Sequence, residues 1–194
     1  MNEKNKRILS LLAILAISLL FAIALEFAWQ FVDHTTHPQK YSETVTKYSK
    51  EYNIPEDVIY ATIKVESNFD PNALSRAGAR GLTQIMPSTF EWLTGDEHLG
   101  EHLTPNMLFD PEVNIRYGTY YLKYLYAKFD YNWSTVAAAY NGGEGNVAKW
   151  LEDSRYSDGN GNLYAFPDEF EETKNYVKKI AKERRQYQNI YYNN

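Results

Sequence analysis

The chain has 194 residues, of which 44% are hydrophobic, and this is enough for one domain of ordinary size with a short appendage. Its formal net charge of −5 gives no electrostatic support to nucleic-acid binding. Because the sequence contains no cysteine, its composition excludes disulfide bonds, zinc–thiolate sites and a thiol nucleophile.

An apolar segment lies close to the N-terminus. Residues 8–25 contain only Ser10 and Ser18 as polar members. A helix of this length spans about 27 Å, close to the ~30 Å hydrocarbon core of a bilayer. Basic residues precede the segment, at Lys4, Lys6 and Arg7. The positive-inside rule therefore predicts that the N-terminus stays inside the cell and the bulk of the chain outside.

Two interpretations of this segment remain open. We favour an uncleaved signal anchor over residues 1–32, with a transmembrane helix at about 8–28, because apolar residues continue through Phe27, Trp29 and Phe31. The alternative is a signal peptide cleaved near the small residues at 22–24. A polar linker is expected at 33–40, and residues 41–194 are expected to form one domain.

Helical periodicity dominates this domain. Apolar residues recur at three- and four-residue spacing, and the predicted helices cover 41–52, 55–66, 88–93, 111–128, 133–140, 146–151 and 171–190. No segment of useful length alternates between apolar and polar residues. The predicted fold class is therefore mainly α.

The helix that starts at Pro55 ends in a carboxylate. Glu66 continues the apolar stripe of Ile59 and Ile63, because residues three or four apart share a helix face. Partial burial and the negative end of the helix dipole would both raise its pKa, as a general acid requires. This segment alone is also compatible with an idle glutamate at an exposed helix end.

Two further segments have the spacing of metal ligands. His98 and His102 would suit zinc only on a helix, and Gly100 lies between them. The loop that starts at Asp158 partly resembles a calcium-binding loop, but Leu163 stands where such a loop requires glycine. We therefore expect a turn at 158–169, with no metal site and no cofactor.

The motifs of residues 41–190 occur in a characteristic order. They are Glu66–Ser67, Gly81–Pro87, Asn114–Ile115 with Gly118 and Tyr121–Leu122, Ala139–Gly143, and Glu172–Thr173 with Tyr176–Val177. In this order they resemble the soluble lytic transglycosylase (SLT) domain family, which comprises lysozyme-like enzymes that cleave bacterial peptidoglycan. The resemblance implies a lysozyme-like helical fold and an extracytoplasmic location.

The resemblance also implies roles for individual residues. The single catalytic acid of the family falls on Glu66. The residues implied in substrate binding are Ser67, Gln84, Met86, Tyr140, Asn141, Glu172 and Tyr176. Tyr140 is expected to hydrogen-bond either the catalytic carboxyl or an acetamido group of the substrate.

This chain departs from the family pattern in three places. Thr83 stands where methionine is usual, and Gly142 stands where alanine is common. The loop at 95–103 is longer than usual and is expected to shape a subsite.

The implied reaction needs only one carboxylate. Glu66 would protonate the oxygen between N-acetylmuramic acid (MurNAc) and N-acetylglucosamine (GlcNAc), and then take the proton of the muramic 6-hydroxyl, which closes a 1,6-anhydro ring. Two alternatives are a goose-type lysozyme that adds water, and a peptidoglycan-binding module without catalysis. The expected partners are glycan strands and the cytoplasmic membrane, with no nucleic acid, for a monomer whose single span places the catalytic domain on the extracytoplasmic face.

Overall fold

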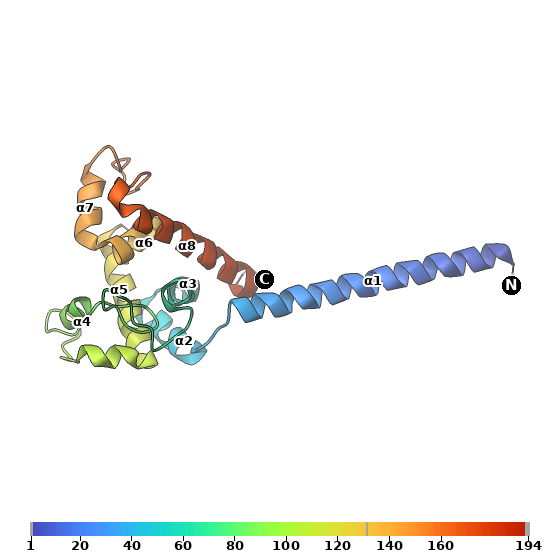
Figure 1. Ribbon diagram of the computed structural model, residues 1–194, viewed down its shortest axis with the longest axis horizontal. Coiled ribbons are helices and arrows are strands. Elements are labelled where there is room, and N and C mark those ends of the chain that lie inside the picture. The colour runs from blue at the N-terminus through green and yellow to red at the C-terminus, as the bar shows by residue number, and fades with distance from the viewer. Residues whose placement is uncertain (1, 131, 193–194) are drawn as a thin grey trace. The chain divides into compact units, whose positions relative to one another are not determined.

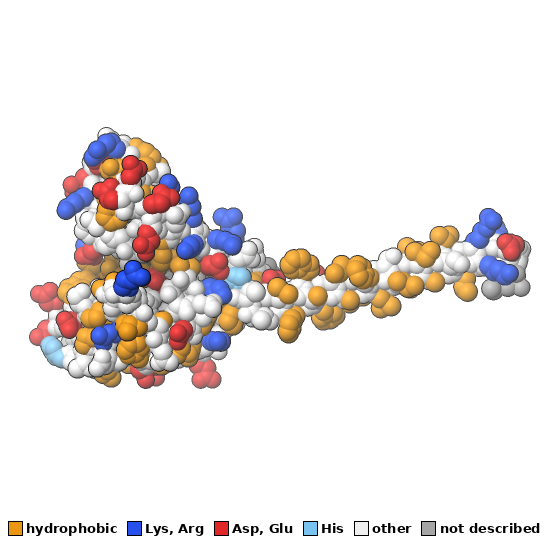
Figure 2. Space-filling view, in the orientation of Figure 1, with side chains coloured by type: hydrophobic (Ala, Val, Ile, Leu, Met, Phe, Trp, Pro, Cys, Tyr) orange, Lys and Arg blue, Asp and Glu red, His pale blue; other side chains and the backbone are white. Residues whose placement is uncertain are grey.

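The computed structural model describes residues 2–130 and 132–192 (Figure 1). The chain forms two compact units, Met1–Pro38 and Gln39–Asn194. The first unit contains the single helix α1 (Glu3–Thr36), none of whose residues is buried. Hydrophobic side chains cover much of its visible face (Figure 2). Its length and composition suit a membrane span, although a signal sequence shares both properties.

The second unit is helical. Its α-helices are α2 (Ser42–Tyr52), α3 (Glu56–Ser67), α4 (Pro87–Leu93), α5 (Pro111–Lys128), α6 (Trp133–Gly142), α7 (Glu144–Glu152) and α8 (Glu171–Tyr187). Short helical turns are η1 (Pro105–Phe109), η2 (Asp168–Phe170) and η3 (Gln188–Tyr192). The described residues contain isolated β-bridges but no named strand. The predicted mainly α, lysozyme-like fold is confirmed.

Side chains define where several helices begin and end. Asp110 Oδ1 accepts hydrogen bonds from the backbone N–H groups of Glu112 and Val113, which caps α5. Asn132 caps α6 in the same way. Asn53 and Asn68 adopt left-handed conformations at the ends of α2 and α3, where asparagine is tolerated. The last predicted helix is shorter than expected, because α8 ends at Tyr187 and continues as the wider turn η3.

A buried amide connects α5 to the loop before α4. Asn114 is fully buried, and its Oδ1 accepts from the N–H of Thr83 at 2.8 Å and from the hydroxyl of Thr83 at 2.7 Å. Its Nδ2 donates to the carbonyls of Arg80 at 2.9 Å and Leu108 at 2.8 Å. The donors and acceptors of this side chain are all engaged, which makes the loop position specific.

The close approach of α5 to this loop depends on glycine. A Cβ built on Gly118 would lie 2.5 Å from Thr83 Oγ1 and 2.8 Å from Thr83 Cβ. Thr83, one of the departures from the family pattern, therefore fits against Gly118 and donates to Asn114.

Gly118→Ala is expected to destabilise the protein by about 1–3 kcal/mol, because the added methyl group overpacks a contact that cannot open without moving Thr83. Urea denaturation measures this change. Gly145→Ala is the matched control, since its Cβ would meet no atom within 4 Å. An unchanged midpoint for Gly118→Ala would show that the helix and the loop are not in close contact.

Candidate active site

Glu66 lies in the last turn of α3, on the face that packs into the domain. Ile59, Thr62 and Ile63 on this face are buried, as the periodicity predicts, and Glu66 itself is half-buried. Tyr176 of α8 donates a hydrogen bond from its hydroxyl to Glu66 Oε1 at 2.7 Å. The carboxyl is therefore held between two helices that are far apart in the sequence.

The surroundings of Glu66 raise its pKa from 4.5 to about 7. Burial is the largest cause, because it disfavours the charged form. The hydrogen bond from Tyr176 acts in the opposite direction, and the negative charge of Glu172 adds to the increase. Burial and nearby negative charge also raise the pKa of Tyr176 far above its ordinary value, so its hydroxyl remains a donor.

Tyr140 of α6 lies close enough to Glu66 for the carboxylate charge to contribute to its raised pKa, for which burial is the main cause. Its hydroxyl, however, donates to the carbonyl of Thr83 at 2.8 Å. The hydroxyl that bonds the carboxyl is thus that of Tyr176. Of the two partners predicted for Tyr140, the carboxyl is not the one that its hydroxyl bonds here, and the acetamido group of the substrate stays a prediction. Asn141 Oδ1 accepts from the hydroxyl of Thr173 at 2.8 Å, which joins α6 to α8.

Ser67 and Gln84 make contacts with the backbone. The Ser67 hydroxyl donates to the carbonyl of Leu82 at 2.8 Å and so attaches the end of α3 to the loop. Gln84 has a left-handed φ of 49°, and its Nε2 donates to the carbonyls of Ala73 and Gly81. These contacts position the loop beside the carboxyl.

A hollow of about 160 Å³ adjoins Gln84 and Tyr140, whereas Glu66 and Tyr176 do not belong to its lining. Its lining includes four of the predicted residues, Gln84, Met86, Tyr140 and Asn141, together with Ile85, Thr89, Tyr121 and Gly143. A second hollow, of about 390 Å³, shares Thr89, Tyr121 and Gly143 with it and is also lined by Ser88, Trp92, Glu144 and Gly145. Because they share these residues, the two hollows adjoin one another, and we call them together the groove between α4, α5 and the α6–α7 turn.

Sequence reasoning missed part of this lining. Tyr121 belongs to the helical stripe of α5, but a stripe indicates burial without distinguishing a core position from a groove position. Trp92 follows Ser88 by four residues, so the two share a face of α4. That spacing is the only local signal that the groove extends along α4.

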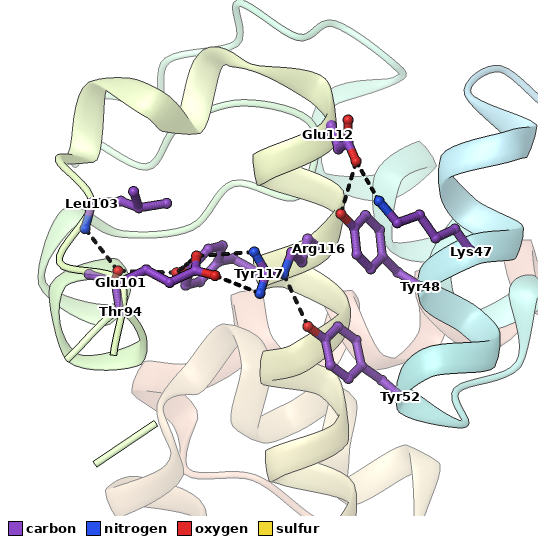
Figure 3. Close-up of polar contacts among 9 residues, drawn as sticks. All are labelled: Lys47, Tyr48, Tyr52, Thr94, Glu101, Leu103, Glu112, Arg116 and Tyr117. Carbon is purple, nitrogen blue, oxygen red and sulfur yellow. Dashed lines mark hydrogen bonds and ion pairs between the residues drawn. The ribbon is translucent and has the colours of Figure 1, made fainter. Parts of the chain in front are cut away.

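The loop at 95–103 folds back onto α5 (Figure 3). Arg116 forms a bidentate ion pair with Glu101, with N–O distances of 2.7 and 3.0 Å, and the Tyr117 hydroxyl donates to the same carboxylate at 2.8 Å. The His98 ring packs against Trp92, with 4.1 Å between the ring centroids. The loop therefore supports Trp92 at the end of the groove.

The two segments with metal-ligand spacing are held by contacts within the protein. His102 Nε2 lies 2.8 Å from Asp96 Oδ1, whereas His98 contacts Tyr120. Asp158 accepts hydrogen bonds from the backbone N–H groups of Asn160 and Asn162, as expected for a turn. Among the described residues, no group of three or more acidic, histidine or cysteine side chains could hold a metal ion.

A helical domain with a half-buried, protonatable glutamate at a helix end and an aromatic groove beside it has the features of the lysozyme-like class. The family model described as Transglycosylase SLT domain matches residues 43–162. The chain therefore belongs to the SLT transglycosylase domain family.

Similar proteins agree with this assignment. The soluble lytic murein transglycosylase of Escherichia coli K12 is 37% identical over 145 residues, which cover 74% of this chain and 22% of that protein. The membrane-bound lytic murein transglycosylase C of Edwardsiella ictaluri is 34% identical over 142 residues, or 67% of this chain and 38% of that protein. The match thus spans well under half the length of these curated relatives.

Solved structures show the same fold. The crystal structure of the 70 kDa soluble lytic transglycosylase of Escherichia coli has a TM-score of 0.72 at 34% identity, and the match covers 80% of this chain and 25% of that one. An inactive glutamate-to-glutamine mutant of the lytic transglycosylase Slt of Pseudomonas aeruginosa has a TM-score of 0.67 at 28% identity, covering 81% and 25%.

Glu66→Gln is expected to stabilise the protein above about pH 7 but not below about pH 4.5. The folded-state pKa of Glu66 is raised, so the folded protein keeps a proton that the unfolded chain loses between these values. The contribution of Glu66 to stability is therefore fully present below about pH 4.5 and declines as pH rises to about 7, by a few kcal/mol. Glutamine, which does not ionise, avoids this loss.

Urea denaturation of the wild type and of Glu66→Gln, at about pH 4.5 and at about pH 7, measures the difference in their free energies of unfolding. Glu91→Gln is the matched control, because the side chain of Glu91 is exposed. If Glu66→Gln and Glu91→Gln changed stability equally at both pH values, Glu66 would not be effectively buried.

Proposed function

We propose that this chain is a peptidoglycan lytic transglycosylase that cleaves the MurNAc–GlcNAc β-1,4 bond with Glu66 as its single general acid and base. The observation that carries the proposal is the half-buried Glu66, whose pKa is raised to about 7. A general acid works best when its pKa lies near the operating pH. The inactive glutamate-to-glutamine mutant of the Pseudomonas relative supports a catalytic glutamate in this family.

The reaction has two proton transfers. Tyr176 holds Glu66 Oε1, so Oε2 is left to present the proton to the glycosidic oxygen. The C1–O4 bond breaks as the proton moves, and the acetamido group of the substrate stabilises the positive charge at C1. The Glu66 carboxylate then takes the proton of the 6-hydroxyl as O6 bonds to C1, which forms the 1,6-anhydro end and restores the acid.

The groove suits a polymeric sugar. Tyr121 and Trp92 offer aromatic surfaces along it, while Thr89 and Ser88 offer hydroxyl groups. Sugars pack their apolar faces on aromatic rings and use their hydroxyl groups for hydrogen bonds. A groove with both aromatic rings and hydroxyl side chains suits both kinds of contact. Gln84, Met86, Tyr140 and Asn141 would contact the sugars nearest the cleaved bond, with Ser67 as a support.

The site also supports a second candidate reaction. The charge of Glu172 contributes to the raised pKa of Glu66, so a second carboxylate lies within electrostatic reach. In a lysozyme-like hydrolase, such a group would activate water on the opposite face of the sugar. A binding module without catalysis is less well supported. Burying the ionisable side chain of Glu66 lowers the stability of the fold above about pH 7, and a module that only binds would gain nothing in return.

Helix α1 would attach the enzyme to the cytoplasmic membrane. Basic residues near its N-terminus favour an inside location for that end, which would leave the catalytic domain on the extracytoplasmic face beside peptidoglycan. The similarity to membrane-bound lytic transglycosylase C supports this placement. The anchor, linker and catalytic domain would cover residues 1–32, 33–40 and 41–194, in a monomer that needs no cofactor.

Mass spectrometry of digested peptidoglycan tests the reaction type. The full chain in detergent is expected to yield 1,6-anhydro-muramic ends, and Glu66→Gln is expected to lower the rate by about 10²–10⁴-fold because the general acid is lost. Glu172→Gln should still yield anhydro ends. Reducing ends that disappear in Glu172→Gln would instead establish the hydrolase.

The rate is expected to fall as pH rises through about 7, because only protonated Glu66 can act as the acid. Initial rates of peptidoglycan solubilisation over a pH series measure this falling limb of the pH–rate profile. Tyr176→Phe should move the limb to higher pH, since the hydrogen bond that it removes lowers the pKa of Glu66. A rate that is flat from acid to alkaline pH would contradict the assignment of Glu66.

A further inference from the structure

We infer that Asp57 and Arg184 are positioning residues that fix the register of α8 along α3 and thereby hold Tyr176 on Glu66. This inference rests on the proposed function, in which Glu66 is the acid. It concerns a contact that lies at the opposite end of the two helices from the carboxyl.

The two helices meet at matched points. Glu66 at the end of α3 contacts Tyr176 near the start of α8, whereas Asp57 at the start of α3 contacts Arg184 near the end of α8. The helices are therefore antiparallel. At 1.5 Å per residue, the two points are roughly 13 Å apart along α3 and roughly 12 Å apart along α8. A single register satisfies both contacts.

The contact at Asp57 is directional and buried. Asp57 is 6% exposed, and its Oδ2 accepts from Arg184 Nε at 2.8 Å and from Gln188 Nε2 at 2.6 Å. A buried carboxylate that loses such donors is costly, so a shift of α8 by one turn is strongly disfavoured. Fixing register is a well-attested use of buried polar contacts.

Apolar packing between the two points is incomplete. A cavity of about 20 Å³ is lined by residues that include Thr62, Ala137, Tyr140, Tyr176 and Arg184. Close packing normally immobilises a helix, and a void removes part of that constraint. Arg184 is among the residues that line the cavity, and its guanidinium lies over the Trp133 ring, 5.2 Å from its centroid. The polar contact at Asp57 therefore adds a directional restraint to the apolar packing of α3 against α8.

Loss of this contact has a specific consequence. If α8 slides along α3 by one helical turn, about 5.4 Å, the Tyr176 hydroxyl no longer reaches Glu66 Oε1, which it now contacts at 2.7 Å. The acid then loses its orientation and the hydrogen bond that lowers its pKa. Thr173 of α8 also donates to Asn141 in the lining of the groove, so a shift of α8 disturbs substrate binding as well, but the loss of acid orientation should lower kcat by a larger factor than KM rises.

A double-mutant cycle on the full chain in detergent tests the inference with peptidoglycan as substrate. Asp57→Asn and Tyr176→Phe are each expected to lower kcat by about tenfold. Because Asp57 acts through Tyr176, the double variant should lose no more than Tyr176→Phe alone. Losses that multiply to about a hundredfold would overturn the inference, since independent sites are additive in free energy.

The pH profile separates positioning from general destabilisation. Asp57→Asn should move the falling limb to higher pH, as Tyr176→Phe does, whereas a loss of folded protein would lower the rate without moving the limb. Arg184→Lys keeps a cation near Asp57 and should lower kcat less than Arg184→Ala, which removes it. If Asp57→Asn does not fold, Gln188→Ala removes only one donor and should lower kcat by about threefold. An unmoved limb in folded variants would overturn the inference.

Tyr192→Phe is the matched control. The Tyr192 hydroxyl donates to Glu56 Oε2 at 2.9 Å, next to Asp57, but makes no contact with Arg184 in the described hydrogen bonds. Its removal should leave kcat and the pH profile unchanged. A wild-type chain without anhydro products would refute the proposed function, whereas an active wild type with multiplying losses would refute only the positioning role.

Discussion

The antiparallel packing of α3 against α8 is the constraint on which the candidate site depends. It places Glu66 and Tyr176, which are 110 residues apart in the sequence, within one hydrogen bond of each other. The same packing half-buries the carboxyl, which raises its pKa. One helix pair thus sets both the protonation and the orientation of the Glu66 carboxyl, and the unfavourable burial of this ionisable group is offset by the packing of the rest of the interface.

The groove itself depends on a different set of contacts, centred on Asn114. Its side chain fixes Thr83, and the carbonyl of Thr83 in turn accepts the hydroxyl of Tyr140. The loop, α5 and α6 are therefore joined by consecutive hydrogen bonds that end at the groove. Because each polar group in this set has a partner, the groove is specific and has little freedom to relax.

Local patterns in the sequence accounted for some features and could not account for others. The periodicity of α3 placed Glu66 on one stripe with Ile59 and Ile63, which are buried, although Glu66 itself is only half-buried. That inference needs only neighbours within two turns. The partner of Glu66 belongs to another helix, so only the family resemblance pointed to Tyr176. No pattern distinguishes a hydroxyl that reaches a carboxyl from one that reaches a backbone carbonyl, and for this reason the partner of Tyr140 required the structure. The groove positions of Trp92 and Tyr121 were hidden for a similar reason, because aromatic residues on a helix face fit a core equally well.

The anchored loop at 95–103 gives the protein a second carboxylate with the opposite behaviour. Burial acts against ionisation of Glu101, but hydrogen bonds from Tyr117 and Arg116 outweigh it, so the pKa of Glu101 is lowered while that of Glu66 is raised. The stabilising charge of Glu101 is lost only as pH falls through its lowered pKa. Between the two pKa values, one carboxylate is charged and holds the loop, and the other is neutral and can give up a proton. Acidification that protonates Glu66 therefore leaves the loop attached to α5, because Glu101 keeps its charge to lower pH.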